Sequence, residues 1–164
     1  MKIKCISLWQ PWASLVARRR KRIETRSWRC PLPAGTLLAI HAAKRWGEDQ
    51  RDIIETPAFS RALHGMGVSW VEGAAPNLPF GAVVGVVRLG ECVTTTEAVW
   101  RPGLVSGDEG HFGDYSPGRF AWVFDAALSF APVPERGRQS IWEWEVPEGL
   151  RPAVGELLRE KGAT

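Results

Sequence analysis

A basic run near the start of the chain holds the residues best suited to chemistry. Residues 18–30 read RRRKRIETRSWRC, with one carboxylate, Glu24, among the cations. Residues 1–47 carry 11 Lys and Arg and one acid, whereas residues 48–164 carry 10 Lys and Arg and 17 acids. The net charge is only +3, but the positive charge is concentrated in the first 47 residues. Because cations meet phosphates and aromatic faces stack on bases, such a run beside tryptophans is typical of a nucleic-acid or nucleotide site. The tryptophans are Trp9, Trp12 and Trp28.

Lys21 and Glu24 are the candidate catalytic pair within this run. Because Arg22 and Arg26 flank the carboxylate, we expect it to be ionised. It could then accept from the amino group or ring N–H of a base, or hold Lys21 in place. Lys21 can act as a base only where some of it is neutral, which the arginines favour and Glu24 opposes. The alternative is a solvated charged face, with ion pairs worth about 0–1 kcal/mol each.

The candidate ligand-binding residues begin at a strand-to-helix junction. Trp9 and Gln10 stand there, where free N–H groups can meet an anion and an indole can stack on a base. Arg26 is expected to meet a phosphate or a carbonyl, and Trp28 adds another aromatic face. The alternative for Trp9 is a place in the core, which helical spacing of apolar residues favours for Trp12.

A glycine-rich loop and a histidine complete the candidate set. Residues 101–118 contain five glycines, together with Asp114 and Tyr115. A long loop of this kind is typical of a lid over a ligand, and an ordinary surface loop is the alternative. His41 ends a predicted strand, where a structural hydrogen-bonding role is more common than catalysis.

The sequence lacks the motifs that are typical of several classes of function. The chain has no H-E-x-x-H spacing, no C-x-x-C pair, no G-x-x-x-x-G-K-[ST] loop and no G-x-G-x-x-G run, so we expect no metal and no cofactor. Three cysteines, an odd number, fit a reducing compartment. No apolar run reaches the roughly 18–20 residues of a membrane span, and no signal peptide is recognisable, so we predict a cytoplasmic protein without a membrane partner.

Apolar periodicity predicts the elements that must position these residues. Strands are predicted at 3–8, 22–28, 36–42, 81–90, 119–130 and 141–146. Helices are predicted at 10–19, at 47–65 with an interruption near Pro57, after a capping box at 94–97, and at 151–161. Separated strands with one early helix between the first two favour an α+β protein, built on a small, mixed, partly closed β-barrel.

Segments in this order resemble the ASCH domain family of the PUA-like superfamily. The family's run G-x-K-x-x-E-x-R after the first helix is matched at Lys21, Glu24 and Arg26, with Arg19 in place of the glycine. The other segments are SLWQPWASL, LAIHAAKRW, VVGVV and FGDYSPGRFAWV, and the likeness spans about residues 3–146. The departure at Arg19 raises the question of whether the helix ends in the family's left-handed turn.

The resemblance implies a small β-barrel with flanking helices, a cleft beside the K-x-x-E motif, and a ligand that is RNA or another nucleic acid, or a modified nucleoside. It places the ASCH domain at 1–148, with a helical tail at 149–164. One branch, the bacterial N4-acetylcytidine amidohydrolases, implies a metal-independent hydrolase in which Lys21 is the activating amine. That branch has Thr where this chain has Glu24, and the candidate for its distal Glu is Glu109. A ribonuclease is a further alternative, and the oligomeric state is open.

Overall fold

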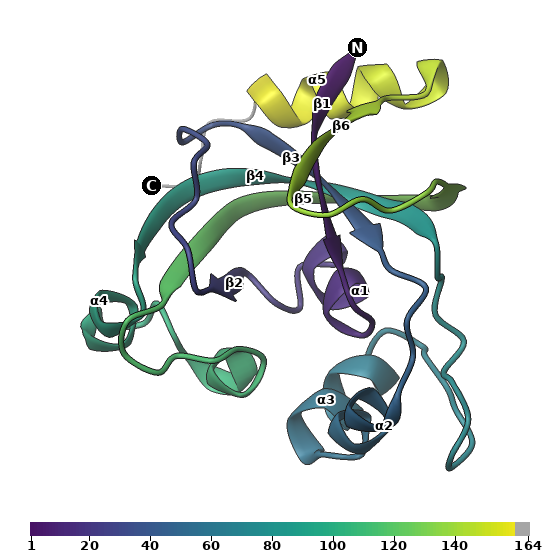
Figure 1. Ribbon diagram of the computed structural model, residues 1–164, viewed down its shortest axis with the longest axis vertical. Helices are drawn as coiled ribbons and strands as arrows, with labels where there is room; N and C mark the ends of the chain where they lie inside the picture. Colours follow the sequence, from purple (N-terminus) through teal and green to yellow (C-terminus); the bar gives the residue numbers. More distant parts are fainter. Residues whose placement is uncertain (160–164) are drawn as a thin grey trace.

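One curved sheet of six strands forms the framework of the protein, and the computed structural model describes residues 1–159 (Figure 1). The strands lie in the order β2-β5-β4-β3-β1-β6; β1 and β3 are parallel and the other neighbours are antiparallel. Their bounds are β1 Lys2–Leu8, β2 Ile23–Arg26, β3 Leu37–Ala42, β4 Ala82–Thr94, β5 Phe120–Pro134 and β6 Ile141–Glu145. Within the described residues the edge strands β2 and β6 do not pair with each other, so the sheet resembles a barrel that stays open.

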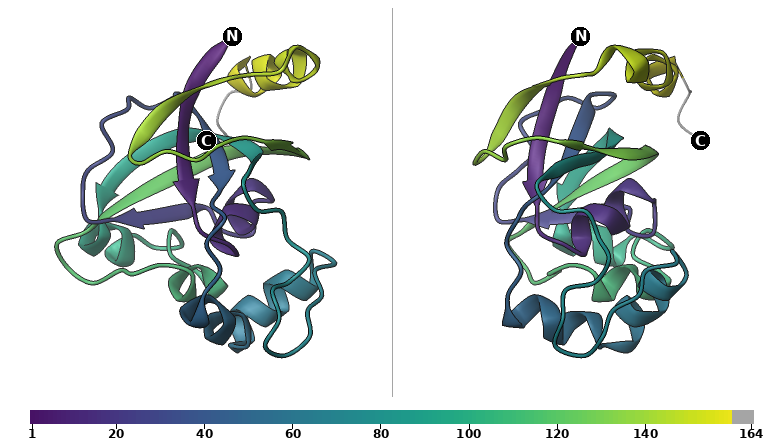
Figure 2. Two further views of the ribbon diagram at one scale, coloured as in Figure 1. Left: turned by 45° about the vertical axis from the view of Figure 1, so that its right-hand side comes forward. Right: turned by 90° about the vertical axis from the view of Figure 1, so that its right-hand side faces the viewer.

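Short helices surround the sheet. They are α1 Trp12–Ala17, α2 Glu48–Ile54, α3 Pro57–His64, α4 Thr95–Trp100 and α5 Arg151–Arg159, with 3-10 turns at Gly107–His111 and Glu148–Leu150. Figures 1 and 2 show α2 and α3 at one end of the molecule and α5 at the opposite end, near the amino terminus. The predicted fold class, an α+β protein with a barrel-like sheet and flanking helices, is confirmed.

The predicted elements are present with shifted boundaries. α1 begins at Trp12, and Pro57 starts a separate helix, because proline lacks an N–H but suits a first helical turn. β4 and β5 run longer than predicted, since their pairing with each other continues through polar and proline-containing ends. The predicted end of the last helix at residue 161 lies outside the described residues.

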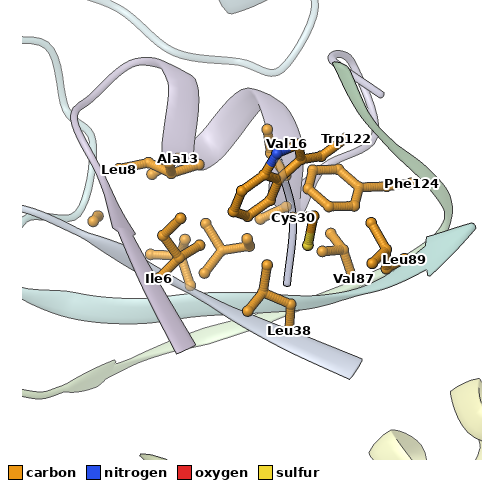
Figure 3. Packing of buried hydrophobic residues seen from close by; sticks show 14 residues of the cluster. Ile6, Leu8, Ala13, Val16, Cys30, Leu38, Val87, Leu89, Trp122 and Phe124 are labelled. Atoms are coloured by element: carbon orange, nitrogen blue, oxygen red, sulfur yellow. The ribbon is translucent and has the colours of Figure 1, made fainter. Parts of the chain in front are cut away.

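The first helix packs on one face of the sheet. Figure 3 shows Val16 of α1 among the buried side chains of this core, which include Leu38 and Trp122. Gly85 of β4 permits the close approach, because a Cβ there would lie 2.8 Å from the Cβ of Ala17. The helix is thereby fixed directly against the sheet.

α5 packs against a second core. Its side chains Val154 and Leu157 lie in a cluster with Trp142 and Trp144 of β6. The guanidinium of Arg88 in β4 also donates to the carbonyl of Leu157 at 2.9 Å. The segment predicted as a helical tail is therefore packed on the sheet, and the predicted domain boundary at residue 148 stays a prediction.

The end of α1 reverses the chain and directs Lys21 inward. The N–H of Arg19 donates to the carbonyl of Val16 at 3.0 Å, and the N–H of Arg20 donates to the carbonyl of Leu15 at 2.8 Å. These two bonds define a Schellman motif, which needs a left-handed residue after the helix. Arg19 adopts that conformation with φ 56°, so the turn is present although the glycine is not.

Arg19→Gly is expected to stabilise the protein, because glycine adopts the left-handed conformation without a Cβ clash. The clash costs about 1–2 kcal/mol, and the extra chain entropy of glycine offsets about 0.5–1 kcal/mol, so the expected gain in the free energy of unfolding is about 0–1.5 kcal/mol. Urea denaturation measures this change. Arg19→Ala is the control, since it removes the same charge and keeps the Cβ. An equal gain in the alanine variant would assign the effect to charge.

Candidate functional site

A cavity of about 470 Å³, here called the β2 cavity, opens where the end of β1, α1, β2 and the loop before β5 meet. The turn after β1 and the helix α1 each contribute an indole ring, β2 contributes a carboxylate and a guanidinium, and the loop contributes one charge of each sign. The lining residues that matter below are Trp9, Trp12, Glu24, Thr25, Arg26, Asp114 and Arg119. The fold thus gathers aromatic and charged groups from segments far apart in the sequence.

Lys21 is buried beside Glu24. Its side chain is 1% exposed, its ammonium lies 3.4 Å from Glu24 Oε2, and it also donates to the carbonyl of Ile23. Lys21 does not line the β2 cavity. Its ammonium is held against Glu24 and the backbone of β2, and a catalytic role for Lys21 stays a prediction.

Glu24 places a carboxylate in the cavity wall. Its Oε1 lies 3.2 Å from Arg26 Nε, its Oε2 faces Lys21, and its side chain is 13% exposed. Alternation along β2 places Glu24 and Arg26 on one face of the strand. A carboxylate held by two cations and still open to a cavity can accept N–H groups of a ligand.

Glu109 supports the beginning of β2. Its buried carboxylate accepts from the backbone N–H groups of Arg22 at 2.9 Å and Ile23 at 3.1 Å. Since β2 is an edge strand, Glu109 supplies acceptors that a neighbouring strand would otherwise provide. It does not line the β2 cavity, and its contacts give it a structural role.

The glycine-rich loop packs on β2 through Thr25. The N–H of Asp114 donates to Thr25 Oγ1 at 2.9 Å, and Gly113 fits there because a Cβ would lie 3.0 Å from the same oxygen. The hydroxyl and N–H of Ser116 donate to Asp114 Oδ1, which lowers the pKa of that carboxyl below its usual value. Arg119 Nε lies 3.3 Å from Asp114 Oδ2. Thr25 and Arg119 therefore line the cavity, although no pattern in the sequence marks them as site residues.

Tyr115 and Gln10 lie outside the β2 cavity. Tyr115 packs against a small apolar cluster that contains Ile23, and burial raises the pKa of its hydroxyl. Gln10 is fully buried; its amide donates to Ser14 Oγ at 2.8 Å and to the carbonyl of Pro79 at 2.7 Å. Both side chains serve the packing of the fold, and neither belongs to the ligand set proposed below.

His41 and Trp28 also lie away from the β2 cavity. Burial lowers the pKa of His41, whose ring nitrogens lie 3.1 Å from Ser7 Oγ and 3.1 Å from the carbonyl of Glu135. Trp28 packs edge-to-face on Trp122, with ring centres 4.7 Å apart, and lines a separate hollow of about 240 Å³. The histidine is thus hydrogen-bonded within the fold, and its part in ligand binding stays a prediction.

Part of the basic run also serves the fold. Arg18 and Arg20 donate to the carbonyls of Met66 and Gly65, each at 3.2 Å, and so join the end of α1 to the segment after α3. Both side chains stay exposed. A phosphate-facing role for residues 18–29 stays a prediction.

Two negative findings concern residues 1–159. No helix in this range combines the length and the apolar character needed to cross a bilayer. The same range contains no group of three or more His, Cys, Asp or Glu side chains arranged to hold a metal ion.

Comparison with known proteins identifies the family. Residues 6–133 match the family described as ASCH domain, and this range includes every residue named above as lining the β2 cavity. The chain belongs to the ASCH domain family, whose PUA-like fold is an RNA-binding fold.

Individual relatives agree with this family. The proteins named Activating signal cointegrator 1 from Homo sapiens and Mus musculus are 36% and 37% identical over 91 residues, which cover 55% of this chain and 14% of each relative. This chain therefore matches a small part of their length. The crystal structure of ASCH from Zymomonas mobilis has a TM-score of 0.51 at 20% identity, with 93% of both chains covered. A mutant of that protein gives a TM-score of 0.53 at 19% identity, covering 94% of this chain and 98% of the other. At these identities the structures show a shared fold.

Lys21→Met is expected to destabilise the protein by about 3 kcal/mol, since removing one partner of a buried ion pair costs about 3–5 kcal/mol and Glu24 keeps Arg26. Urea denaturation provides the free energy of unfolding. The double variant Lys21→Met/Glu24→Gln is the control, because it removes the unpaired charge as well. We expect it to lose less than the sum of the two single losses; additivity within about 0.3–0.5 kcal/mol would show that the pair does not interact.

Proposed function

We propose that the protein binds single-stranded RNA and takes one unpaired base into the β2 cavity. The observation that carries the proposal is the Glu24 carboxylate, held by Lys21 and Arg26 in the wall of a cavity that Trp9 also lines. RNA recognition relies on splayed bases that stack on aromatic rings and present their edges to hydrogen-bonding groups. The family's fold supports the same class of ligand.

The aromatic wall suits a base next to a phosphate. Trp9 is 44% exposed, and the guanidinium of Arg45 lies 4.4 Å from the centre of its ring. An indole with an adjacent cation is the combination that proteins use to stack a base and meet its backbone. The cavity volume of about 470 Å³ falls within the usual range for small-ligand sites, which is roughly 300–1,000 Å³.

The polar wall suits the edge of a base. Glu24 can accept from an amino group, whereas Arg26 and Arg119 can donate to carbonyl or phosphate oxygens. Because Lys21 and Arg26 hold the carboxylate, little side-chain freedom is lost when a base binds. The arrangement supports discrimination among bases, in addition to attraction for phosphate.

The geometry supports binding more than the hydrolase alternative. Lys21, the amine that the amidohydrolase resemblance requires, is buried against Glu24 and a backbone carbonyl and does not line the cavity. Glu24 stands where that branch has its Thr nucleophile. Glu109, the candidate for the distal carboxylate, accepts from two backbone N–H groups.

Trp9→Ala is expected to weaken RNA binding by about 1–3 kcal/mol, the usual value of one base–aromatic stack, which corresponds to about 5-fold to 150-fold in Kd. Fluorescence anisotropy with a labelled single-stranded RNA of mixed sequence measures the change. Trp100→Ala is the matched control, since it removes an indole that is 81% exposed on α4 and does not line the cavity. Equal losses in the two variants would contradict stacking on Trp9.

Glu24→Gln is expected to change base preference. The wild-type protein should bind oligo(C) more tightly than oligo(U), because cytosine offers an amino group to the carboxylate and uracil offers a carbonyl at that position. The variant should lose about 1–3 kcal/mol of this difference. Competition titrations compare it with Glu72→Gln, which alters an exposed carboxylate before β4. An unchanged ranking of the two oligomers in Glu24→Gln would refute the proposed readout.

A further inference from the structure

A larger cavity of about 840 Å³, here called the loop cavity, is lined by the β5–β6 loop (residues 135–140) and the end of β3. It is lined by three cations, Lys44, Arg136 and Arg138, and by one carboxylate, Glu135, which accepts from the backbone N–H of Arg136 at 2.9 Å. Within residues 1–159 no carboxylate lies within ion-pair distance of any of them. Arg138 lies over the ring of Trp142, with 5.4 Å to the ring centre. Cations without an ion pair around a cavity are suited to a phosphodiester, whose oxygens accept from several donors at once.

Several contacts fix the β5–β6 loop to the sheet, among them the N–H of Glu135, which donates to the carbonyl of Gly81 at 3.1 Å. Ser7 Oγ of β1 donates to the carbonyl of Arg138 at 3.2 Å, and His41 Nε2 of β3 donates to the carbonyl of Glu135 at 3.1 Å. Gly137 lies directly against the histidine, since a Cβ there would stand 2.5 Å from His41 Cε1. Arg136 and Arg138 therefore project from backbone that is already ordered, which reduces the entropy lost when they bind a ligand.

Shared walls connect the loop cavity to the β2 cavity. Ser7 lines both of them and also the hollow of about 240 Å³ beside Trp28. Arg26 is common to that hollow and the β2 cavity, and Arg138 is common to the hollow and the loop cavity. The three depressions are therefore neighbours near the C-terminal end of β1, and each is lined by at least one cation.

We infer that the loop cavity binds the sugar–phosphate backbone of the nucleotides next to the base in the β2 cavity, with Lys44, Arg136 and Arg138 as its phosphate ligands. The inference rests on the proposed RNA binding and extends it from one base to a strand segment. Trp28, which is 36% exposed between the two cavities, offers a stacking face to an intervening base. The strand crosses the end of β1 at Ser7.

The test compares a short and a long ligand in the whole chain. Cytidine binding is followed by NMR chemical shifts, and binding of an eight-nucleotide oligo(C) RNA by anisotropy over a range of salt concentrations. Arg136→Gln/Arg138→Gln should bind the octamer about tenfold or more weakly at low salt, and the log–log salt slope should fall in magnitude by about 0.7 for each phosphate that the variant no longer neutralises. Its affinity for cytidine should equal that of the wild type.

Lys2→Gln/Arg159→Gln is the matched control, since it removes the same charge from two exposed residues outside the three depressions. Equal octamer affinities in the two double variants would overturn the proposed phosphate binding in the loop cavity and would not affect the proposed base site in the β2 cavity. Equal affinities of the wild-type protein for cytidine and for the octamer would also overturn phosphate binding in the loop cavity. A wild-type protein that binds neither ligand would overturn both proposals.

Discussion

The buried ammonium of Lys21 is the interaction on which the rest of the site depends. A cation that is 1% exposed needs partners, because an unpaired ion in the interior of a protein costs several kcal/mol. Its partners are the carbonyl of Ile23 and the carboxylate of Glu24, and both belong to β2. The left-handed turn at Arg19 delivers the ammonium to that strand. The contacts of Lys21 therefore join the end of α1, the edge strand β2 and the carboxylate of Glu24.

A strand of four residues at a sheet edge has little stability of its own, and three further supports surround β2. β5 pairs with it from Ile23 to Arg26, Glu109 satisfies the N–H groups at its beginning, and Thr25 accepts from the loop at Asp114. These supports fix the face that carries Glu24. A rigid acceptor can distinguish one base edge from another, which a mobile surface carboxylate cannot do.

Local patterns predict the parts of this protein that local forces determine. Six strands, the break at Pro57 and the proximity of Lys21 and Glu24 follow from apolar periodicity, proline chemistry and a spacing of three residues. Gln10 and His41 could not be placed in this way, because their partners Pro79 and Glu135 are 69 and 94 positions away. Short-range patterns carry no information on which distant carbonyl will accept a hydrogen bond from a polar side chain.

The charge pattern of the sequence illustrates the same limit. Counted along the chain, positive charge concentrates in residues 1–47, whereas Arg136 and Arg138 belong to the acidic remainder. The sheet order places β6 beside β1, and the pairing of Ile6 with Ile141 brings the β5–β6 loop to the C-terminal end of β1. Many acids of the later segment are meanwhile taken up in ion pairs elsewhere, as Asp108 is with Arg61 and Glu91 with Arg101. The cations around Ser7 thus come from both ends of the chain, and their concentration is a property of the strand order.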